Sequence, residues 1–164
     1  QVDQKVRLRL SRLTGLAKVP GVAEWVNDEQ KNGLQKIVLF AWHREVIAAL
    51  RQHVGQMTCV VTGETTARER DVQKGLFQTS SSHNVFIGQI QAAGEAIDLS
   101  AADEVLFVES SYVPKDNQQA AARVLNINKT RPTLARFATL TGSIDERIQS
   151  IAQRKLEDIR KVFA

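Results

Sequence analysis

The sequence is poor in the residues that build covalent or metal frameworks. It has a single cysteine, Cys59, which cannot form a disulfide or a thiolate metal cluster within the chain. Its three histidines, at positions 43, 53 and 83, lack the short spacing of metal ligands. We therefore expect no metal site, and we expect Cys59, within the apolar run 57–61, to be a buried strand residue.

Long apolar runs are also absent. The longest, 37–42, has the length of a strand and falls far short of the roughly 20 residues that span a bilayer. A secretory signal is missing too. We expect a protein that is not secreted and has no membrane partner, cytoplasmic or nucleoid-associated in a bacterium or phage and nuclear in a eukaryote. Because the chain begins at Gln1 rather than at methionine, we expect it to be a segment of a longer polypeptide.

Several catalytic and nucleotide-binding signatures are missing. No Gly-Lys-Ser or Gly-Lys-Thr occurs, so the sequence has no P-loop. No Gly-x-Gly-x-x-Gly follows a predicted strand, which leaves little support for a free-standing Rossmann-type ligand domain. Neither a Ser-His-Asp order nor a nucleophile elbow stands out. The pair Asp103-Glu104 looks like a magnesium-binding acid pair, but it precedes its strand, and we interpret it as a polar strand start.

What is present suits one globular domain. Hydrophobic residues make up 43% and charged residues 24% of 164 residues, enough for a single core. A net charge of +4 and a pI near 9.5 mildly favour a polyanionic partner. Residues 1–14 lack a clean apolar period and predict a linker or an irregular arm, and residues 15–164 predict the folded domain.

Strands and helices alternate along the chain. Predicted strands lie at 37–40, 58–61, 84–88, 105–108 and 134–140, and predicted helices at 16–30, 44–54, 66–77, 114–125 and from 143 onward. Thr66 and Glu69 form a capping box at the start of the third helix. This alternation predicts an α/β fold with a mainly parallel sheet covered on both faces. Ligands of such a sheet bind in the loops at the carboxyl ends of the strands.

Six segments of the sequence, taken in their order along the chain, form a recognisable pattern. They are Lys36-Ile-Val-Leu-Phe-Ala-Trp-His43, 63–70 with Phe77, 90–103, 107–114, Gln119-Ala-Ala-Ala-Arg123 and 142–148. Their order and spacing resemble the C-terminal helicase lobe of Swi/Snf-type ATPases. The annealing-helicase branch looks closest, because its central segment has Ala-Ala and ends in Ser-Ala-Asp. The resemblance covers residues 14–155.

The resemblance implies a RecA-like, three-layer α/β/α domain that is the second lobe of a DNA-dependent ATPase and ends in a long C-terminal helix. In this family two lobes clamp ATP and duplex or branched DNA between them. ATP and magnesium are held mainly by the first lobe, an N-terminal RecA-like lobe of the same polypeptide. We therefore expect the 164-residue chain alone not to hydrolyse ATP.

The resemblance also implies roles for individual residues. Arg123 matches a phosphate-facing arginine, and the other positions that match the nucleotide side are Gly94, Glu95, Asp98 and Gln119. The positions that match DNA contacts are His43, Gly63, Thr65, Gln91 and Ala92. Backbone amides and small hydroxyls at these loops suit contacts along phosphates, which carry no sequence information.

The departures from the family pattern bear on catalysis. Asn126 stands where the family has its second arginine, the arginine finger, and asparagine cannot supply positive charge. Asn128-Lys129 replaces a Gly-Gln pair; Ala96, Tyr112 and Val113 replace a glycine, a tryptophan and an asparagine. Two hypotheses stay open: a motor lobe that contributes Arg123 and position 126 to catalysis, or a catalytically degenerate lobe that binds DNA or a protein.

Overall fold

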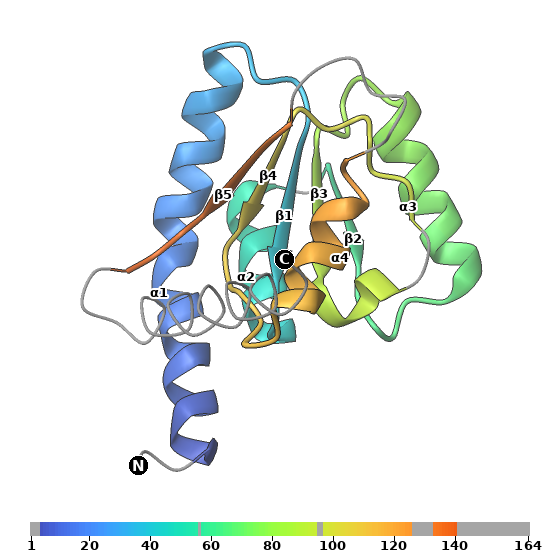
Figure 1. The fold of residues 1–164 in the computed structure, drawn as a ribbon. Coiled ribbons are helices and arrows are strands. Elements are labelled where there is room, and N and C mark those ends of the chain that lie inside the picture. Colours follow the sequence, from blue (N-terminus) through green and yellow to red (C-terminus); the bar gives the residue numbers. More distant parts are fainter. Residues whose placement is uncertain (1–3, 56, 95–96, 126–132, 141–164) are drawn as a thin grey trace, which may run out of the picture.

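Five parallel strands form the centre of the molecule. The structure is a computed structural model that describes residues 4–55, 57–94, 97–125 and 133–140 (Figure 1). The strand order is β2-β3-β1-β4-β5, and every neighbouring pair is parallel. The strands are β1 (Ile37–Ala41), β2 (Thr58–Val61), β3 (Val85–Gln89), β4 (Glu104–Phe107) and β5 (Leu134–Phe137).

Helices cover both faces of this sheet (Figure 1). The cluster on one face packs α1 (Gln4–Lys31) and α2 (Arg44–Val54) against the strands. The cluster on the other face does the same with α3 (Ala67–Thr79), the 3-10 helix η1 (Ile90–Gly94) and α4 (Pro114–Ala122). The predicted three-layer α/β/α architecture is thereby confirmed.

Strand β1 shows why the sequence gives a sheet buried on both faces. All five of its residues are buried. Because side chains alternate along a strand, Val38 and Phe40 join the core under α3 and α4, whereas Ile37 and Leu39 join the core under α1 and α2. An uninterrupted apolar run is the sequence pattern that such a central parallel strand requires.

Two local predictions at the ends of elements are confirmed. The amide of Glu69 donates to Thr66 Oγ1 at 3.3 Å, and the amide of Thr66 donates to Glu69 Oε2 at 3.1 Å, so the capping box starts α3. Glu104 is the first residue of β4 and Asp103 directly precedes it. Both acids therefore lie at the amino end of the strand, away from the edge where ligands of parallel sheets bind.

Helix α1 differs from the prediction. It begins at Gln4, so residues 4–14 are helical and not an irregular arm. The apolar period is hidden because Ser11, a polar residue, is the only position of this stretch that is buried among those whose burial the structure describes. Its large apolar residues in that stretch are exposed: Val6, Leu8, Leu10 and Leu13. The domain boundary at residue 15 stays a prediction.

The position of Pro20 also differs from the prediction, because Pro20 lies inside α1 and not near its start. At the other end of the chain, β5 ends at Phe137, three residues short of the predicted strand. The long helix predicted from residue 143 falls outside the described residues. Of the helices that the structure describes, none combines the length and the apolar character needed to cross a membrane.

The environment of Cys59 leads to a test of the core. Its thiol is fully buried in β2, and this burial raises the pKa of Cys59 to about 11, against a smaller opposing effect of the Lys36 charge. We expect the native chain to resist iodoacetamide near neutral pH and to be labelled once it is unfolded in urea, because the thiolate is the reactive form. Mass spectrometry measures the labelling, and fast modification of the native chain would contradict this packing.

Candidate functional site

The carboxyl ends of the strands bring distant parts of the sequence together. His43 follows β1, Gly63 and Thr65 follow β2, and Gln91 and Ala92 lie in η1 directly after β3. Since β3 lies between β2 and β1, these three loops are neighbours along one edge of the sheet. The structure thus places all five of these sequence-predicted residues at the same edge.

The loop after β2 is held by its own hydrogen bonds. The amide of Gly63 donates to Gln89 Oε1 at 2.9 Å, and the amide of Thr65 donates to the Thr62 carbonyl at 3.2 Å. The Thr65 hydroxyl oxygen accepts from the Thr62 amide at 2.9 Å. The sequence suggested backbone amides for phosphate contacts at this loop, but the Gly63 and Thr65 amides are already used inside the protein. A ligand at this loop therefore meets hydroxyl groups or has to displace these bonds.

A buried arginine also holds this loop through hydrogen bonds. Arg70 of α3 is 7% exposed, and it donates from Nε to the Thr65 carbonyl at 3.0 Å and from Nη2 to the Thr62 carbonyl at 3.3 Å. Its guanidinium therefore orders the loop, which explains the Glu-Arg pair in the sequence segment 63–70.

The loop after β1 is fixed by a buried carboxylate. Glu109, two residues beyond β4, has a side chain that is 2% exposed. Its Oε1 accepts from the Trp42 amide at 3.0 Å and the His43 amide at 2.9 Å, and its Oε2 lies 2.6 Å from His43 Nδ1. Because Nδ1 faces Glu109, Nε2 is the ring nitrogen of His43 that remains for an outside ligand. Sequence reasoning did not single out Glu109; an acid directly after a buried strand was the available signal.

Helix α1 packs closely over this carboxylate. A Cβ at Gly15 would lie 2.9 Å from Glu109 Oε2 and 2.9 Å from Val46 Cγ2, so only glycine fits there. One turn further on, the buried Lys18 donates from Nζ to the carbonyls of Val108 and Ala138. Glycine and lysine together bind α1 to the ends of β4 and β5.

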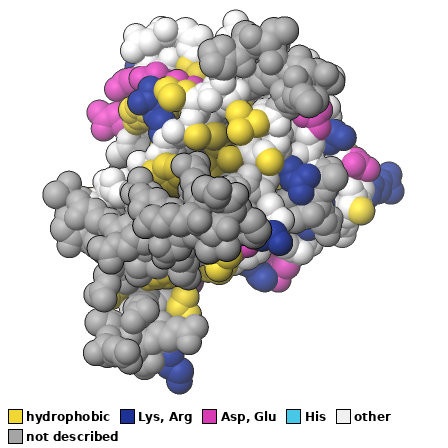
Figure 2. Space-filling view, in the orientation of Figure 1, with side chains coloured by type: hydrophobic (Ala, Val, Ile, Leu, Met, Phe, Trp, Pro, Cys, Tyr) yellow, Lys and Arg dark blue, Asp and Glu magenta, His cyan; other side chains and the backbone are white. Residues whose placement is uncertain are grey.

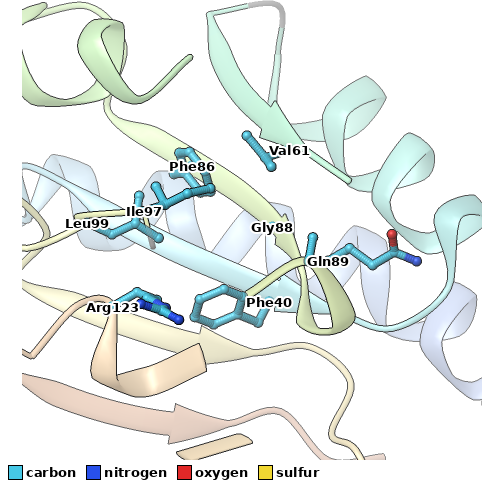
Figure 3. A pocket seen from close by; sticks show the side chains of 9 residues that line it. Phe40, Val61, Phe86, Gly88, Gln89, Ile97, Leu99 and Arg123 are labelled. Atoms are coloured by element: carbon cyan, nitrogen blue, oxygen red, sulfur yellow. The ribbon is translucent and has the colours of Figure 1, made fainter. Parts of the chain in front are cut away.

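The residues matched to the nucleotide side lie farther along the chain, around α4. Arg123 directly follows α4, and its carbonyl accepts from the Leu99 amide at 2.8 Å. Its half-buried side chain lines a cavity of about 10 Å³ beside Phe40 (Figure 3). This volume holds at most one water molecule, so the cavity is not a nucleotide pocket.

The other nucleotide-side positions are more open or not described. Gln119 is exposed on α4. Asp98 is exposed, and its Oδ1 accepts from the Ser100 amide at 2.9 Å. Gly94 ends η1. Glu95 and Asn126 lie outside the described residues.

Hydrogen bonds of Asn117 hold the turn before α4, where Val113 departs from the family pattern. Buried Asn117 accepts from the Ser111 amide at 2.9 Å and donates to the Ser111 carbonyl at 3.0 Å. Val113 is the N-cap residue and makes no side-chain capping bond, and Pro114 opens the helix. The turn is thus held by Asn117, which lies within α4, and needs no asparagine at position 113.

Among the described residues, two arginines near this edge are paired with acids. Arg44 pairs with Glu64 across the loops after β1 and β2, and Arg12 pairs with Glu45. On the face shown in Figure 2, lysine and arginine side chains are scattered among acidic ones. Within the described residues, no group of three His, Cys, Asp or Glu side chains could hold a metal ion.

The family described as "Helicase conserved C-terminal domain" matches residues 18–128, from the middle of α1 to just beyond α4. The chain belongs to this family. The match contains every strand whose loop carries a predicted DNA contact, and it contains both Gln89 and Glu109.

Curated relatives place the chain beside Swi/Snf-type proteins. It is 25% identical over 165 residues to "SWI/SNF-related matrix-associated actin-dependent regulator of chromatin subfamily A-like protein 1" of Drosophila melanogaster. The aligned region covers 99% of this chain and 22% of that protein. The protein of the same name from Xenopus tropicalis is 28% identical, covering 94% and 17%. "Chromatin-remodeling ATPase INO80" of Pyricularia oryzae is 28% identical, covering 80% and 7%. The chain therefore spans less than a quarter of the length of these relatives.

A solved structure agrees in fold. "Crystal structure of the C-terminal part of Fun30 ATPase domain" superposes with a TM-score of 0.69 at 24% identity, covering 77% of this chain and 41% of that one. The match supports the RecA-like α/β fold of the helicase C-terminal domain.

The role of Arg70 can be tested by substitution. We expect Arg70→Met to lower the free energy of unfolding by about 2 kcal/mol or more, because the Thr62 and Thr65 carbonyls lose a charged donor. Urea denaturation measures this change. Arg68→Met is the matched control, because Arg68 is exposed on the same helix and its loss should change stability by less than about 0.5 kcal/mol. Equal effects of the two substitutions would show that Arg70 does not order the loop.

Proposed function

We propose that this chain is the second motor lobe of a larger, DNA-dependent ATPase of the Swi/Snf type. The observation that carries the proposal is the match to the helicase C-terminal family over residues 18–128, which contains three neighbouring loops at the carboxyl edge of the sheet. The first lobe would belong to the part of the polypeptide that the relatives have and this segment does not cover.

For DNA, the proposed contacts run along the phosphate backbone. The groups proposed for these contacts are Nε2 of the partly exposed His43, the hydroxyl of the partly exposed Thr65 and the exposed side chain of Gln91. Gly63 contributes an exposed turn without a side chain, whereas Ala92 is 7% exposed and contributes little surface. Such uncharged or weakly charged contacts give weak, sequence-independent binding, which suits a motor that releases and grips again at each step.

For ATP, the proposed contribution of this lobe is positive charge. Arg123 would face the phosphates, where a cation stabilises charge that develops during phosphoryl transfer. Gln119 would hold α4 against the nucleotide, and Gly94, Glu95 and Asp98 would join the DNA-facing loops to it. The first lobe would supply the P-loop and the ligands of magnesium, which would stabilise negative charge on the phosphates when bound.

The names of the relatives suggest where such a motor works. They are described as regulators of chromatin and chromatin-remodeling ATPases. We propose that the parent protein acts on duplex or branched DNA, in the nucleus if its source is eukaryotic.

Binding of duplex DNA by the 164-residue chain tests the DNA half of the proposal. We expect weak binding without sequence preference, with an affinity that falls as salt rises from about 50 to about 200 mM, because salt screens the attraction between the phosphates and the chain's net charge of +4. Fluorescence anisotropy with two unrelated duplexes measures both properties. Strong preference for one sequence, or affinity that salt does not change, would contradict phosphate contacts.

Substitution of Arg123 in the full-length parent tests the ATP half. We expect Arg123→Ala to lower DNA-stimulated turnover by about 10³-fold or more, whereas the isolated chain should show no turnover because it has no P-loop. Phosphate release measures both. Gln118→Ala serves as control, since Gln118 is an exposed neighbour on α4. Unchanged turnover in Arg123→Ala would remove Arg123 from the nucleotide site.

Asn126 separates the motor lobe from the degenerate lobe. We expect Asn126→Arg to raise the turnover of the parent if that position points toward the nucleotide, because it restores a cation. A parent that stays inactive with every DNA tested, with and without Asn126→Arg, would favour a lobe that only binds DNA or a protein. Loss of activity in Lys129→Ala or Arg131→Ala would instead show that the second cation comes from a neighbouring position.

A further inference from the structure

A continuous series of hydrogen bonds crosses the carboxyl edge of the sheet. It runs from the Gly63 amide to Gln89 Oε1, from Gln89 Nε2 to the Trp42 carbonyl at 3.1 Å, and from the Trp42 and His43 amides to Glu109. The strands that carry these groups lie in the same order, β2, β3, β1 and β4. Each bond therefore joins neighbouring loops, and the series spans four of the five strands.

Gln89 links the loop after β2 to the loop after β1, the two loops on either side of β3. It is the last residue of β3 and is 9% exposed. Its acceptor serves the loop after β2, and its donor serves the loop after β1. Figure 3 shows the amide extending away from Arg123. Since both polar ends of this buried side chain are engaged within the protein, Gln89 has little capacity to contact an outside ligand directly.

The length of the side chain matters as much as its polarity. Position 89 lies between the neighbouring strands, and only a planar amide with donor and acceptor at its far end serves a carbonyl on one side and an amide on the other. Thr65 and His43, the proposed phosphate contacts, lie two residues from Gly63 and one residue from Trp42. The two bonds of Gln89 thus connect the loops that carry these two contacts.

We propose, resting on the proposed function, that Gln89 is a positioning residue for DNA binding. It holds the loops after β1 and β2 at a fixed distance, so that His43 and Thr65 meet the same stretch of phosphate backbone. Gln89 does not touch DNA itself. Its contribution is to order both loops before binding, which spares the complex the loss of conformational freedom that mobile loops would suffer on binding.

Two substitutions in the 164-residue chain separate position from polarity. Gln89→Met keeps the length and removes both hydrogen bonds, and Gln89→Asn keeps the amide but is too short to reach both loops. We expect each to raise the dissociation constant for duplex DNA about tenfold, the effect of losing one or two hydrogen bonds. The salt dependence should stay unchanged, because no charge is removed. Gln52→Met is the control, since Gln52 is exposed near the far end of α2.

A second readout shows whether a variant retains the fold. The amide resonances of Gly63, Trp42 and His43 should shift in both Gln89 variants. The amide resonances of α2 and the melting temperature should stay close to those of the unsubstituted 164-residue chain. A variant that has lost cooperative melting is replaced by Gln89→Glu, which keeps the acceptor for Gly63 and loses the donor for Trp42; Trp42 and His43 resonances should then shift more than that of Gly63.

The outcomes distinguish this proposal from the one on which it rests. Unchanged DNA affinity in folded Gln89 variants would overturn the positioning role and leave the DNA-binding lobe intact. The positioning role would also be overturned if Gln89→Asn binds DNA as tightly as the unsubstituted chain while Gln89→Met binds weakly. The polarity of the side chain, and not its length, would then determine the affinity. If the unsubstituted 164-residue chain does not bind duplex DNA at any salt concentration, the DNA half of the proposed function is overturned, and the positioning role with it.

Discussion

The buried carboxylate of Glu109 is the interaction on which the loop edge of this domain depends. A carboxylate that is removed from water is costly unless hydrogen bonds satisfy it. Glu109 faces two backbone amides and the Nδ1 of His43, and Gly15 lets α1 close over it. One side chain thereby fixes the loop after β1, the start of the loop after β4 and the position of the first helix.

Buried and partly buried cations perform the same task elsewhere in the described chain. Lys36 donates to three carbonyls at and beyond the end of α3, and burial lowers the pKa of this lysine. Lys18 joins α1 to the ends of β4 and β5, and Arg70 orders the loop after β2. These charged side chains bind backbone carbonyls of neighbouring elements and so connect the helices to the sheet and its loops. Groups on such a scaffold are held in place before a ligand arrives.

Much of the fold could be predicted from the sequence, because strands buried on both faces need apolar runs and the capping box has a local signature. The start of α1 could not, since the only described buried position within residues 4–14 is the polar Ser11, and the large apolar residues of that stretch are exposed. The family resemblance identified the loops of the candidate site. The roles of Gln89 and Glu109 depend on which strands are neighbours, which no local pattern contains. The same applies to the Gly63 amide, which was expected to face phosphates and instead binds Gln89.

We propose from the family match and the shared loop edge that this chain is one half of a two-lobed motor, in which the loops at the carboxyl ends of the strands contact DNA and α4 contacts the nucleotide. The most direct test of that claim is phosphate release by the full-length protein, measured with and without duplex DNA under otherwise equal conditions. The account predicts hydrolysis that duplex DNA stimulates. Hydrolysis that DNA leaves unchanged, or none with any DNA structure, would contradict it.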